Sequence, residues 1–393
     1  HLFMATSAVS TTGLVTINTP DAYNLGGHLI LLFGMQIGGL GYMTLGSFVI
    51  LANKKRLPGL REEVARATFT LPDGFDIRRF LIRVVRFSIV VEAIGTGLLY
   101  FTFKNGGVEN PFWMALFHSI SSFCTAGFSL FPNGLEQFQS DFWINAILCG
   151  LSLSGAMGFL VMSDLWETWF GGKEATTLTT RIILHATFWS IGIGWAILFL
   201  TDAGMQALPA EDRLMVSGFQ TISALTTAGF NTYPIGAIAS STTLVLIVLM
   251  ILGASPSGTG GGLKSTSVSA ALAVMWSTVR GKDKITFWGK EVPEHRLFTA
   301  FAALVFYAAT FIVGAGLLLL VDSHHFEDVL FEAASALGTV GLSRGITGDL
   351  SHLGTLIVTA LMFIGRVGPL TFGLALFAGA ENNIEEGKED LAV

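Results

Sequence analysis

One short pattern occurs four times along this chain and limits what the chain can fold into. The pattern is Phe, three residues, Ser, three residues, Thr, any residue, Gly, and then Leu or Phe. Its copies are Phe3, Ser7, Thr11, Gly13, Leu14; Phe117, Ser121, Thr125, Gly127, Phe128; Phe219, Ser223, Thr227, Gly229, Phe230; and Phe331, Ser335, Thr339, Gly341, Leu342. Successive threonines are 114, 102 and 112 residues apart. Such regular periods predict an internal fourfold repeat.

Each copy predicts a short helix that ends in a turn. Phe, Ser and Thr four residues apart share one helix face, and the glycine permits a positive φ. Four helix C-termini around one axis would offer rings of backbone carbonyls, which can replace the water shell of a monovalent cation. The predicted selectivity filter comprises Thr11, Thr12, Gly13, Thr125, Ala126, Gly127, Thr227, Ala228, Gly229, Thr339, Val340 and Gly341.

The fourth copy, "GTVGL" from Gly338 to Leu342, also resembles the Thr-Val-Gly core of potassium-channel filters. None of the four copies continues as Tyr-Gly. We therefore expect fewer stacked carbonyl rings, and weaker discrimination between cations, than in those channels.

The composition predicts an all-α integral membrane protein. The 393 residues are 51% hydrophobic and 13% charged, whereas a soluble domain has about a quarter charged residues. Stretches long enough to cross a bilayer lie near 25–52, 80–103, 142–166, 182–201, 241–276, 298–321 and 353–379. Shorter helical segments near 1–10, 112–124, 214–226 and 328–338 are re-entrant candidates, and each carries one copy of the repeat.

Charge in the loops predicts the orientation in the membrane. Seventeen of the 22 Lys and Arg residues fall on one side, mainly in loops 53–79 and 277–297. This side is expected to be cytoplasmic. The opposite side, which carries the filter segments, holds Lys104, Arg213 and Arg344 among many acids. An acidic outer mouth would concentrate cations, although ordinary solvated loops explain the same acids.

Two further stretches carry a resemblance to a known family. "MQIGGLGYMTLGSF" (Met35 to Phe48) and "GRVGPLTFGLAL" (Gly365 to Leu376), with the four filter copies, resemble the KtrB branch of the Trk/Ktr/HKT superfamily of potassium transporters. The resemblance covers essentially the whole chain. It implies four tandem units of outer helix (M1), pore loop and inner helix (M2) in a pseudo-fourfold arrangement around one central pore. Eight spans are then expected, and the first outer helix should precede His1 in a longer chain.

On that resemblance the chain divides into five parts. Residues 1–52 form repeat 1 without its outer helix, 53–166 form repeat 2, and 167–276 form repeat 3 with an intramembrane gating loop at 253–267. Residues 277–379 form repeat 4, and 380–393 form a cytoplasmic C-terminal tail.

The gating loop reads "GASPSGTGGGLKSTS" and interrupts the apolar stretch 241–276. Glycines and a proline break a helix at membrane depth, and the freed backbone then needs polar surroundings. A Walker A loop is excluded, because Leu263 stands where its second glycine should be and no strand precedes it. Resemblance assigns gating to Gly258, Thr259, Gly260, Gly261, Gly262, Lys264 and Arg366.

Arg366 lies deep in the span 353–379 and is functional by default. The alternative role is structural, in which it satisfies freed carbonyls of the loop. Gln36 and Glu92 are also polar groups inside spans, and without an evident partner we interpret them as packing residues. His118 in the second pore helix is interpreted as a satisfied buried histidine rather than a metal ligand.

The predicted function is a translocating subunit for K⁺, with Na⁺ left open as a coupling or activating ion and no cofactor. A Na⁺-conducting or non-selective transporter of the same fold is the alternative. An intramembrane hydrolase is disfavoured, because "GLSLSG" has Leu153 after Ser152 where the rhomboid pattern needs glycine. A secondary transporter of inverted halves is disfavoured because the repeats all run the same way.

The resemblance further implies partners and a location. We expect a multi-pass protein of the cell (inner or plasma) membrane, with pore loops outside and the basic loops and C-terminus in the cytoplasm. Expected partners are membrane lipid, a second copy in a homodimer, and a cytoplasmic RCK ring of nucleotide-binding, KtrA-like subunits. No nucleic acid partner is expected.

Overall fold

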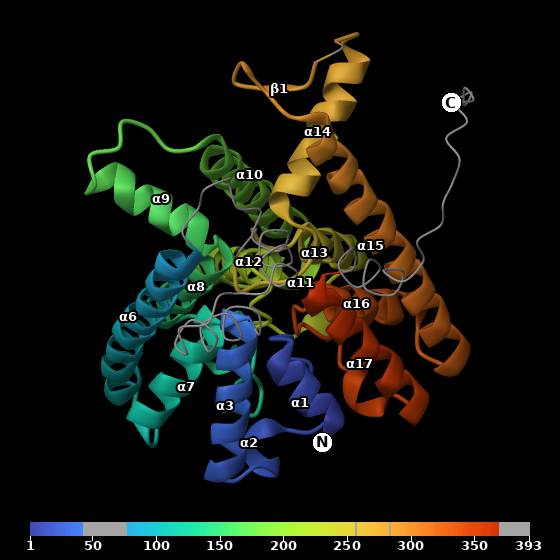
Figure 1. Cartoon of the computed structure of the whole chain (residues 1–393). Coiled ribbons are helices and arrows are strands. Elements are labelled where there is room, and N and C mark those ends of the chain that lie inside the picture. Colours follow the sequence, from blue (N-terminus) through green and yellow to red (C-terminus); the bar gives the residue numbers. More distant parts are fainter. Residues whose placement is uncertain (42–76, 256–257, 283, 369–393) are drawn as a thin grey trace.

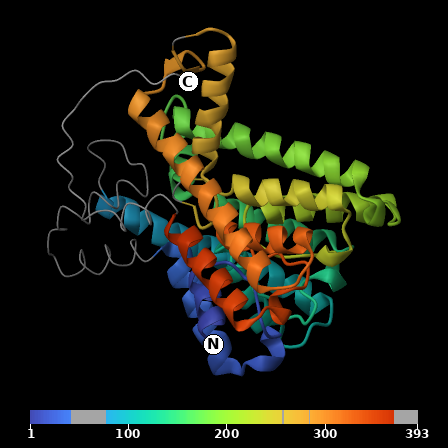
Figure 2. The same cartoon turned by 90° about the vertical axis from the view of Figure 1, so that its right-hand side faces the viewer.

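The computed structural model is predominantly helical, and it describes residues 1–41, 77–255, 258–282 and 284–368. Several predicted features lie outside these ranges: most of the basic loop 53–79, the far ends of the spans 25–52 and 353–379, and the tail 380–393. The predicted all-α class needs one small correction. Thr286–Phe287 (β1) and Lys290–Glu291 (β2) form an antiparallel hairpin, which projects with α14 at the top of Figures 1 and 2.

The helices follow a recurring order: a long helix, then a helix that carries the repeated pattern, called the short helix below, and then a third helix, called the medium helix below. The long helices are α6 (Ile77–Asn105), α10 (Leu178–Thr201) and α15 (Glu294–Val321). The helices carrying the repeated pattern are α1 (Leu2–Val9), α7 (Pro111–Phe123), α12 (Ala210–Leu225) and α16 (Phe326–Gly338). The following helices are α3 (Leu25–Leu40), α8 (Phe142–Ala156), α13 (Ser240–Leu252) and α17 (His352–Val367), with α9 (Phe159–Trp169) after α8 and α14 (Ser265–Val279) after α13. The short connecting helices are α2 (Thr19–Ala22), α11 (Ala203–Gln206) and three single 3₁₀ turns at Glu136–Phe138, Ile235–Ala237 and Thr347–Asp349.

Three helices of the described residues are long and apolar enough to cross a membrane by themselves. They are the 82–105 part of α6, all of α10, and 296–321 of α15, which agree with three predicted spans. Each packs beside the short helix that follows it in sequence, so α6 lies on α7, α10 on α12 and α15 on α16. Figure 1 shows α6 and α15 at opposite edges of the molecule, with α10 between them.

The predicted span 142–166 is not one straight helix. Its two parts, α8 and α9, differ in direction by 100°. The bend occurs at Gly158, whose φ of 88° is open to glycine and strained for other residues. The apolar composition alone could not reveal this, because both arms are apolar. The predicted break after residue 252 is present, since α13 ends at Leu252 and α14 begins at Ser265.

Glycines let the medium helices approach the short ones. In three of the four units, a Cβ added to a glycine would overlap a backbone carbonyl two residues before the repeated threonine. The pairs are Gly38 against the Val9 oxygen, Gly155 against the Phe123 oxygen, and Gly365 against the Leu337 oxygen. Backbone therefore packs directly on backbone where each short helix ends.

In each of these helices a second glycine follows three residues after the first, at the end of the helix. Gly41, Gly158 and Gly368 have φ values of 77°, 88° and 89°, and Gly253 at the end of α13 has φ 54°. The sequence therefore holds a second repeat, Gly-x-x-Gly, in three units, with Met250 in place of the first glycine in the third unit. This pattern was available to the sequence analysis and was missed there.

The close approach at Gly155 predicts a stability difference between two glycines of one helix. A Gly155→Ala methyl group would overlap the Phe123 oxygen, so we expect a loss of about 1–3 kcal/mol in the free energy of unfolding. Gly150→Ala is the matched control on α8, because no described atom lies within 4 Å of its added Cβ. Thermal unfolding in one detergent should give a lower midpoint for Gly155→Ala only. Equal midpoints would contradict the packing described here.

Candidate filter and gate

The four repeated segments end in the same turn. The threonine after each helix has a positive φ: 53° at Thr11, 52° at Thr125, 58° at Thr227 and 50° at Thr339. The amide of the next residue donates to the carbonyl of the repeated serine, over 2.8 Å from Thr12 to Ser7 and from Val340 to Ser335. This is the Schellman arrangement of a helix C-terminus, in which glycine is the usual left-handed residue. Threonine takes that place here at a cost of roughly 1–2 kcal/mol each.

The repeated serines hold the chain that follows each turn. In the first and fourth copies, Ser7 Oγ and Ser335 Oγ accept the amides of Gly13 and Gly341, both over 3.0 Å. In the second and third copies, the serine hydroxyl donates to the carbonyl of the phenylalanine after the glycine. The repeated serine, on the helix face predicted from the spacing, thus hydrogen-bonds to backbone groups after each threonine and fixes the conformation of the turn.

The four turns touch one another in a closed order. A Cβ at Gly13 would lie 2.5 Å from the Ala126 oxygen, and one at Gly127 would lie 2.9 Å from the Ala228 oxygen. A Cβ at Gly229 would overlap the Val340 oxygen, and one at Gly341 would overlap the Thr12 oxygen. Each turn therefore meets the next, and the last meets the first. The carbonyls of the central residues lie where no side chain fits.

The chain between α13 and α14 lies directly against all four threonines. Thr259 Oγ1 is 3.3 Å from Thr125 Oγ1, and the Thr259 carbonyl accepts from Thr11 Oγ1 over 3.5 Å. The Gly261 amide donates to Thr227 Oγ1 over 3.2 Å. A Cβ at Gly261 would overlap Thr339 Oγ1. The structure thus brings the predicted gating segment and the predicted filter residues together.

This segment is also fixed to its surroundings through the backbone. The Thr259 amide donates to the Gly155 carbonyl over 3.0 Å, and the Ser255 amide donates to the Ala156 carbonyl over 3.1 Å. These carbonyls are the last two of α8, which their own helix leaves free. The loop therefore uses the open end of a neighbouring helix to satisfy its backbone hydrogen-bonding groups.

Two cationic side chains, Arg366 and Lys264, donate hydrogen bonds to carbonyls of the loop. The Arg366 guanidinium donates to the carbonyls of Thr259 and Gly38, so it joins α17, the loop and α3. The Lys264 ammonium donates to the Gly260 carbonyl over 3.0 Å. Gly258, Gly260 and Gly262 have no room for a side chain, since a Cβ at Gly260 would lie 2.5 Å from Thr227 Oγ1. The structural alternative for Arg366 is therefore present in part, because it satisfies one loop carbonyl.

Gln36 and Glu92 have a partner that the sequence analysis did not identify, namely each other. Gln36 Nε2 donates to both carboxylate oxygens of Glu92 over 3.0 and 3.1 Å. The thiol of Cys124, the residue before Thr125, lies 3.5 Å from Gln36 Oε1. Glu92 also lines a mostly apolar cavity of about 600 Å³ with Thr96 and Tyr100. Two polar residues in otherwise apolar spans were the available signal, but their contact depends on how α3 and α6 pack.

Polar groups also lie buried behind the turns, at the position after the repeated phenylalanine in the second, third and fourth copies; the first copy has Met4 there. His118 Nδ1 is 2.8 Å from the Met114 carbonyl, and Nε2 is 3.0 Å from Ser129 Oγ. The prediction of a satisfied buried histidine is confirmed. Glu332 occupies the same position in the fourth copy and accepts from Ser343 Oγ over 2.8 Å and from Thr347. Sequence reasoning missed Glu332, although the third and fourth copies both carry a polar residue there.

Outside the turns, the second and third copies are joined by Asn231. Its side-chain Nδ2 donates to Glu136 Oε1 over 2.9 Å, and its backbone carbonyl accepts from the Leu135 backbone amide over 3.0 Å. Partial burial raises the pKa of Glu136, and the Asn231 amide opposes this shift. This contact links two loops that stand nearly 100 residues apart in sequence, as the residue numbers show.

Comparison with known proteins gives the family. A sequence profile described as "TrkH: Cation transport protein" matches residues 1–383. The chain belongs to the TrkH family of cation transport proteins. It is 34% identical over 380 residues to "Ktr system potassium uptake protein B" of Vibrio alginolyticus, which covers 95% of this chain and 83% of that protein. It is 29% identical to "Potassium/sodium uptake protein NtpJ" of Enterococcus hirae, over 96% of this chain and 85% of that one.

Among solved structures, the fold matches that of the potassium transporter TrkH from Vibrio parahaemolyticus with a TM-score of 0.77. The match covers 95% of this chain and 77% of that chain at 19% identity, which supports the fold alone. The helical architecture of this TrkH family member therefore agrees with both the sequence profile and the structural neighbour.

The strained threonines predict that one substitution will stabilise the protein. Thr339 Oγ1 is buried and has no hydrogen-bond partner among the described residues. Thr339→Gly removes this buried hydroxyl and the left-handed strain, so we expect a gain of about 1 kcal/mol in stability. Thr125→Gly is the comparison, because it also removes the contact with Thr259 and should gain less. The midpoints of thermal unfolding of the two variants test this prediction. A larger rise in midpoint for Thr125→Gly than for Thr339→Gly would contradict it.

Proposed function

We propose that this chain is the membrane subunit of a potassium uptake system and that K⁺ crosses it between the four Thr-x-Gly turns. The observation that carries the proposal is the closed order of contacts from Gly13 to Ala126, Gly127 to Ala228, Gly229 to Val340 and Gly341 to Thr12. Four segments separated by about a hundred residues meet there. The name of the Vibrio alginolyticus relative, a potassium uptake protein of a Ktr system, supports the same substrate.

The filter works through its backbone. Carbonyls of Thr12, Ala126, Ala228 and Val340, together with those of the flanking threonines and glycines, would replace the hydration shell of the ion. The pseudo-fourfold arrangement of four M1–pore-loop–M2 units is part of this proposal. Its support is the repetition of one turn in all four copies. In each copy a backbone amide donates to the carbonyl of the repeated serine, and the threonine and the glycine both have positive φ angles. The packing of each turn on the next keeps the carbonyl positions fixed.

The loop from Gly258 to Lys264 would act as the gate. It contacts all four filter threonines, so an ion leaving the filter would meet it first. Opening then requires the loop to exchange its contacts with Gly155, Ala156 and Arg366 for others. The Arg366 guanidinium adds a positive charge beside the path, and a cation in the path raises the barrier for K⁺.

A Na⁺-conducting or non-selective transporter is the second candidate. Its support is the Enterococcus relative, whose name includes both potassium and sodium. Gly13, Gly127, Gly229 and Gly341 are all present, which favours potassium, because in some plant members of the superfamily a serine replaces the first filter glycine.

The assembly and the orientation belong to the proposal as well. We place the protein in the cell membrane with its pore turns outside and its basic loops inside, on the strength of the Lys and Arg distribution. The naming of relatives as parts of a Ktr system supports partner subunits. A homodimer with a cytoplasmic RCK ring is the form that we propose for them.

Uptake competition tests the substrate. In potassium-depleted cells that carry the chain with its partner subunits, excess K⁺ should suppress uptake of radioactive Rb⁺ far more than excess Na⁺ does. Cells without the chain provide the background. Equal suppression by the two ions would favour the non-selective alternative, and stronger suppression by Na⁺ would refute the potassium assignment.

Replacement of Arg366 tests the gate. Arg366→Ala removes both the charge and the bridge between the Thr259 and Gly38 carbonyls, so we expect Rb⁺ flux to rise. Arg366→Lys keeps the charge but cannot present the two-sided guanidinium fork. A rise in both variants would identify the bridge as the restraint, whereas a rise in Arg366→Ala only would identify the charge. Unchanged flux in Arg366→Ala would remove this residue from the gate.

A further inference from the structure

The helix α9 presents an aromatic face that the proposed pathway does not use. Trp166, Trp169 and Phe170 are 66%, 70% and 71% exposed. They stand at positions i, i+3 and i+4, so they share one side of the helix and its C-terminal end. The ring centroids of Trp166 and Phe170 are 4.6 Å apart. A contiguous patch of this kind marks an interaction surface.

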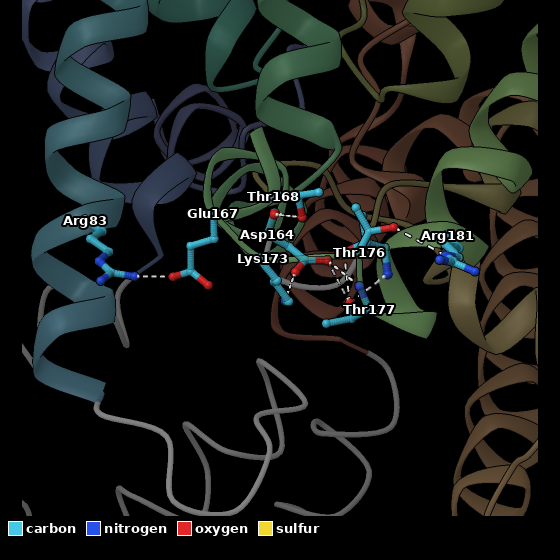
Figure 3. Close-up of polar contacts among 9 residues, drawn as sticks. Arg83, Asp164, Glu167, Thr168, Lys173, Thr176, Thr177 and Arg181 are labelled. Carbon is cyan, nitrogen blue, oxygen red and sulfur yellow. Dashed lines mark hydrogen bonds and ion pairs between the residues drawn. The ribbon is translucent and has the colours of Figure 1, made fainter. Parts of the chain in front are cut away.

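The other side of α9 is fixed by polar contacts (Figure 3). The buried Asp164 carboxylate accepts from the Thr177 amide over 2.8 Å, from Thr177 Oγ1 over 3.0 Å and from the Lys173 ammonium. Glu167 pairs with Arg83 of α6 over 2.9 Å. These contacts hold α9 between α6 and the start of α10. Its aromatic side is therefore turned outward by the rest of the structure.

The direction of α9 indicates what this side meets. It leaves α8 at 100°, so it runs across the direction of that helix rather than along it. Only eight residues separate α9 from α10, which is long and apolar enough to span a membrane. Because the Asp164 carboxylate of α9 accepts hydrogen bonds from Thr177, the residue that caps the start of α10, α9 lies at the level of that end of α10. In Figure 3, the basic side chains of Arg83, Lys173 and Arg181 lie at a similar height along α9 and the start of α10, with Arg83 paired to Glu167 and Lys173 to Asp164.

We propose that α9 is an interfacial helix whose Trp166, Trp169 and Phe170 side chains insert into the cytoplasmic leaflet. Tryptophan favours the boundary between headgroups and acyl chains, because its ring is apolar and its N–H is polar. An amphipathic helix in the plane of the membrane binds through the apolar area that it buries there. The occupant of this surface is thus lipid rather than a second copy or a soluble partner.

The position of α9 connects this surface to the loop. Only Met157 and Gly158 separate α9 from the Gly155 and Ala156 carbonyls that accept from Thr259 and Ser255. Movement of α9 at the membrane surface would therefore shift the end of α8 that holds the loop. This second half of the inference rests on the proposed function of the loop as a gate, whereas the insertion of α9 does not.

Tryptophan quenching in liposomes tests the insertion. The fluorescence that is lost in the Trp166→Phe/Trp169→Phe variant, compared with the parent, isolates the α9 signal. We expect this signal to be quenched by lipids brominated near the headgroup end of the acyl chain, and only weakly by bromine at the chain terminus or by aqueous iodide. Dominant quenching by iodide would show a water-exposed surface, and no quenching by any agent would show a protein-covered one. Either result overturns the proposal.

Rubidium flux tests the connection to the loop. Replacing Trp166, Trp169 and Phe170 by Ser should release α9 from the leaflet and raise flux severalfold. The matched control replaces Phe188 and Trp189 of α10, which are similarly exposed and lie outside the α8–α9 segment that holds the loop. Equal flux in the triple variant and the parent would overturn the connection while the quenching result stands by itself. If Arg366→Ala fails to alter flux, the gate proposal fails, and the quenching experiment still decides the insertion.

Discussion

Direct contact between backbones is the constraint on which the rest of this structure depends. Around the Thr-x-Gly turns, carbonyls of one segment lie where a neighbouring glycine would carry its Cβ, and this occurs for all four turns. The same holds one layer away, where Gly38, Gly155 and Gly365 meet the ends of the short helices. Dispersion contacts and fixed hydrogen bonds replace side-chain packing there. Neighbouring helices and turns therefore approach most closely where a glycine leaves room for the backbone of the other segment.

This packing explains how strained threonines are tolerated. Each of the four adopts a left-handed conformation that costs roughly 1–2 kcal/mol without glycine, and strain of this kind persists only where the surroundings determine it. Here the surroundings are the serine contacts inside each copy and the neighbouring turns. What threonine adds over glycine is a hydroxyl group that faces the loop. Thr125 and Thr227 use it on Thr259 and Gly261, which joins the candidate filter and gate into one hydrogen-bonded unit.

A chain at membrane depth must also satisfy its polar groups internally. The loop meets this requirement with the free end of α8 and with Arg366 and Lys264. Glu92 meets it with Gln36, and Glu332 with Ser343 and Thr347. Glu92 lies beside Cys124, the residue before Thr125, and Glu332 lies on α16, the helix that leads into Thr339.

The sequence by itself determined the elements and their repetition. Four short helices, the turn after each, and the break in the span after residue 252 follow from local spacing, glycine and apolar length, which act within a few residues of each other. His118 could be interpreted correctly for the same reason, because its partner Met114 lies one helical turn away. The family also followed from motifs that stand in the sequence, and the profile match over residues 1–383 agrees with it.

Only the tertiary structure decided which of these parts meet. Three kinds of contact join residues that stand 56 to 329 positions apart in sequence: the pairing of Gln36 with Glu92, the placement of Thr259 against Thr11 and Thr125, and the order in which the turns touch, which closes between Thr12 and Gly341. The bend that turns α9 away from α8 depends on Asp164, Thr177 and Arg83, which lie on three segments. Local propensity cannot specify such contacts, because each depends on the packing of whole helices against one another.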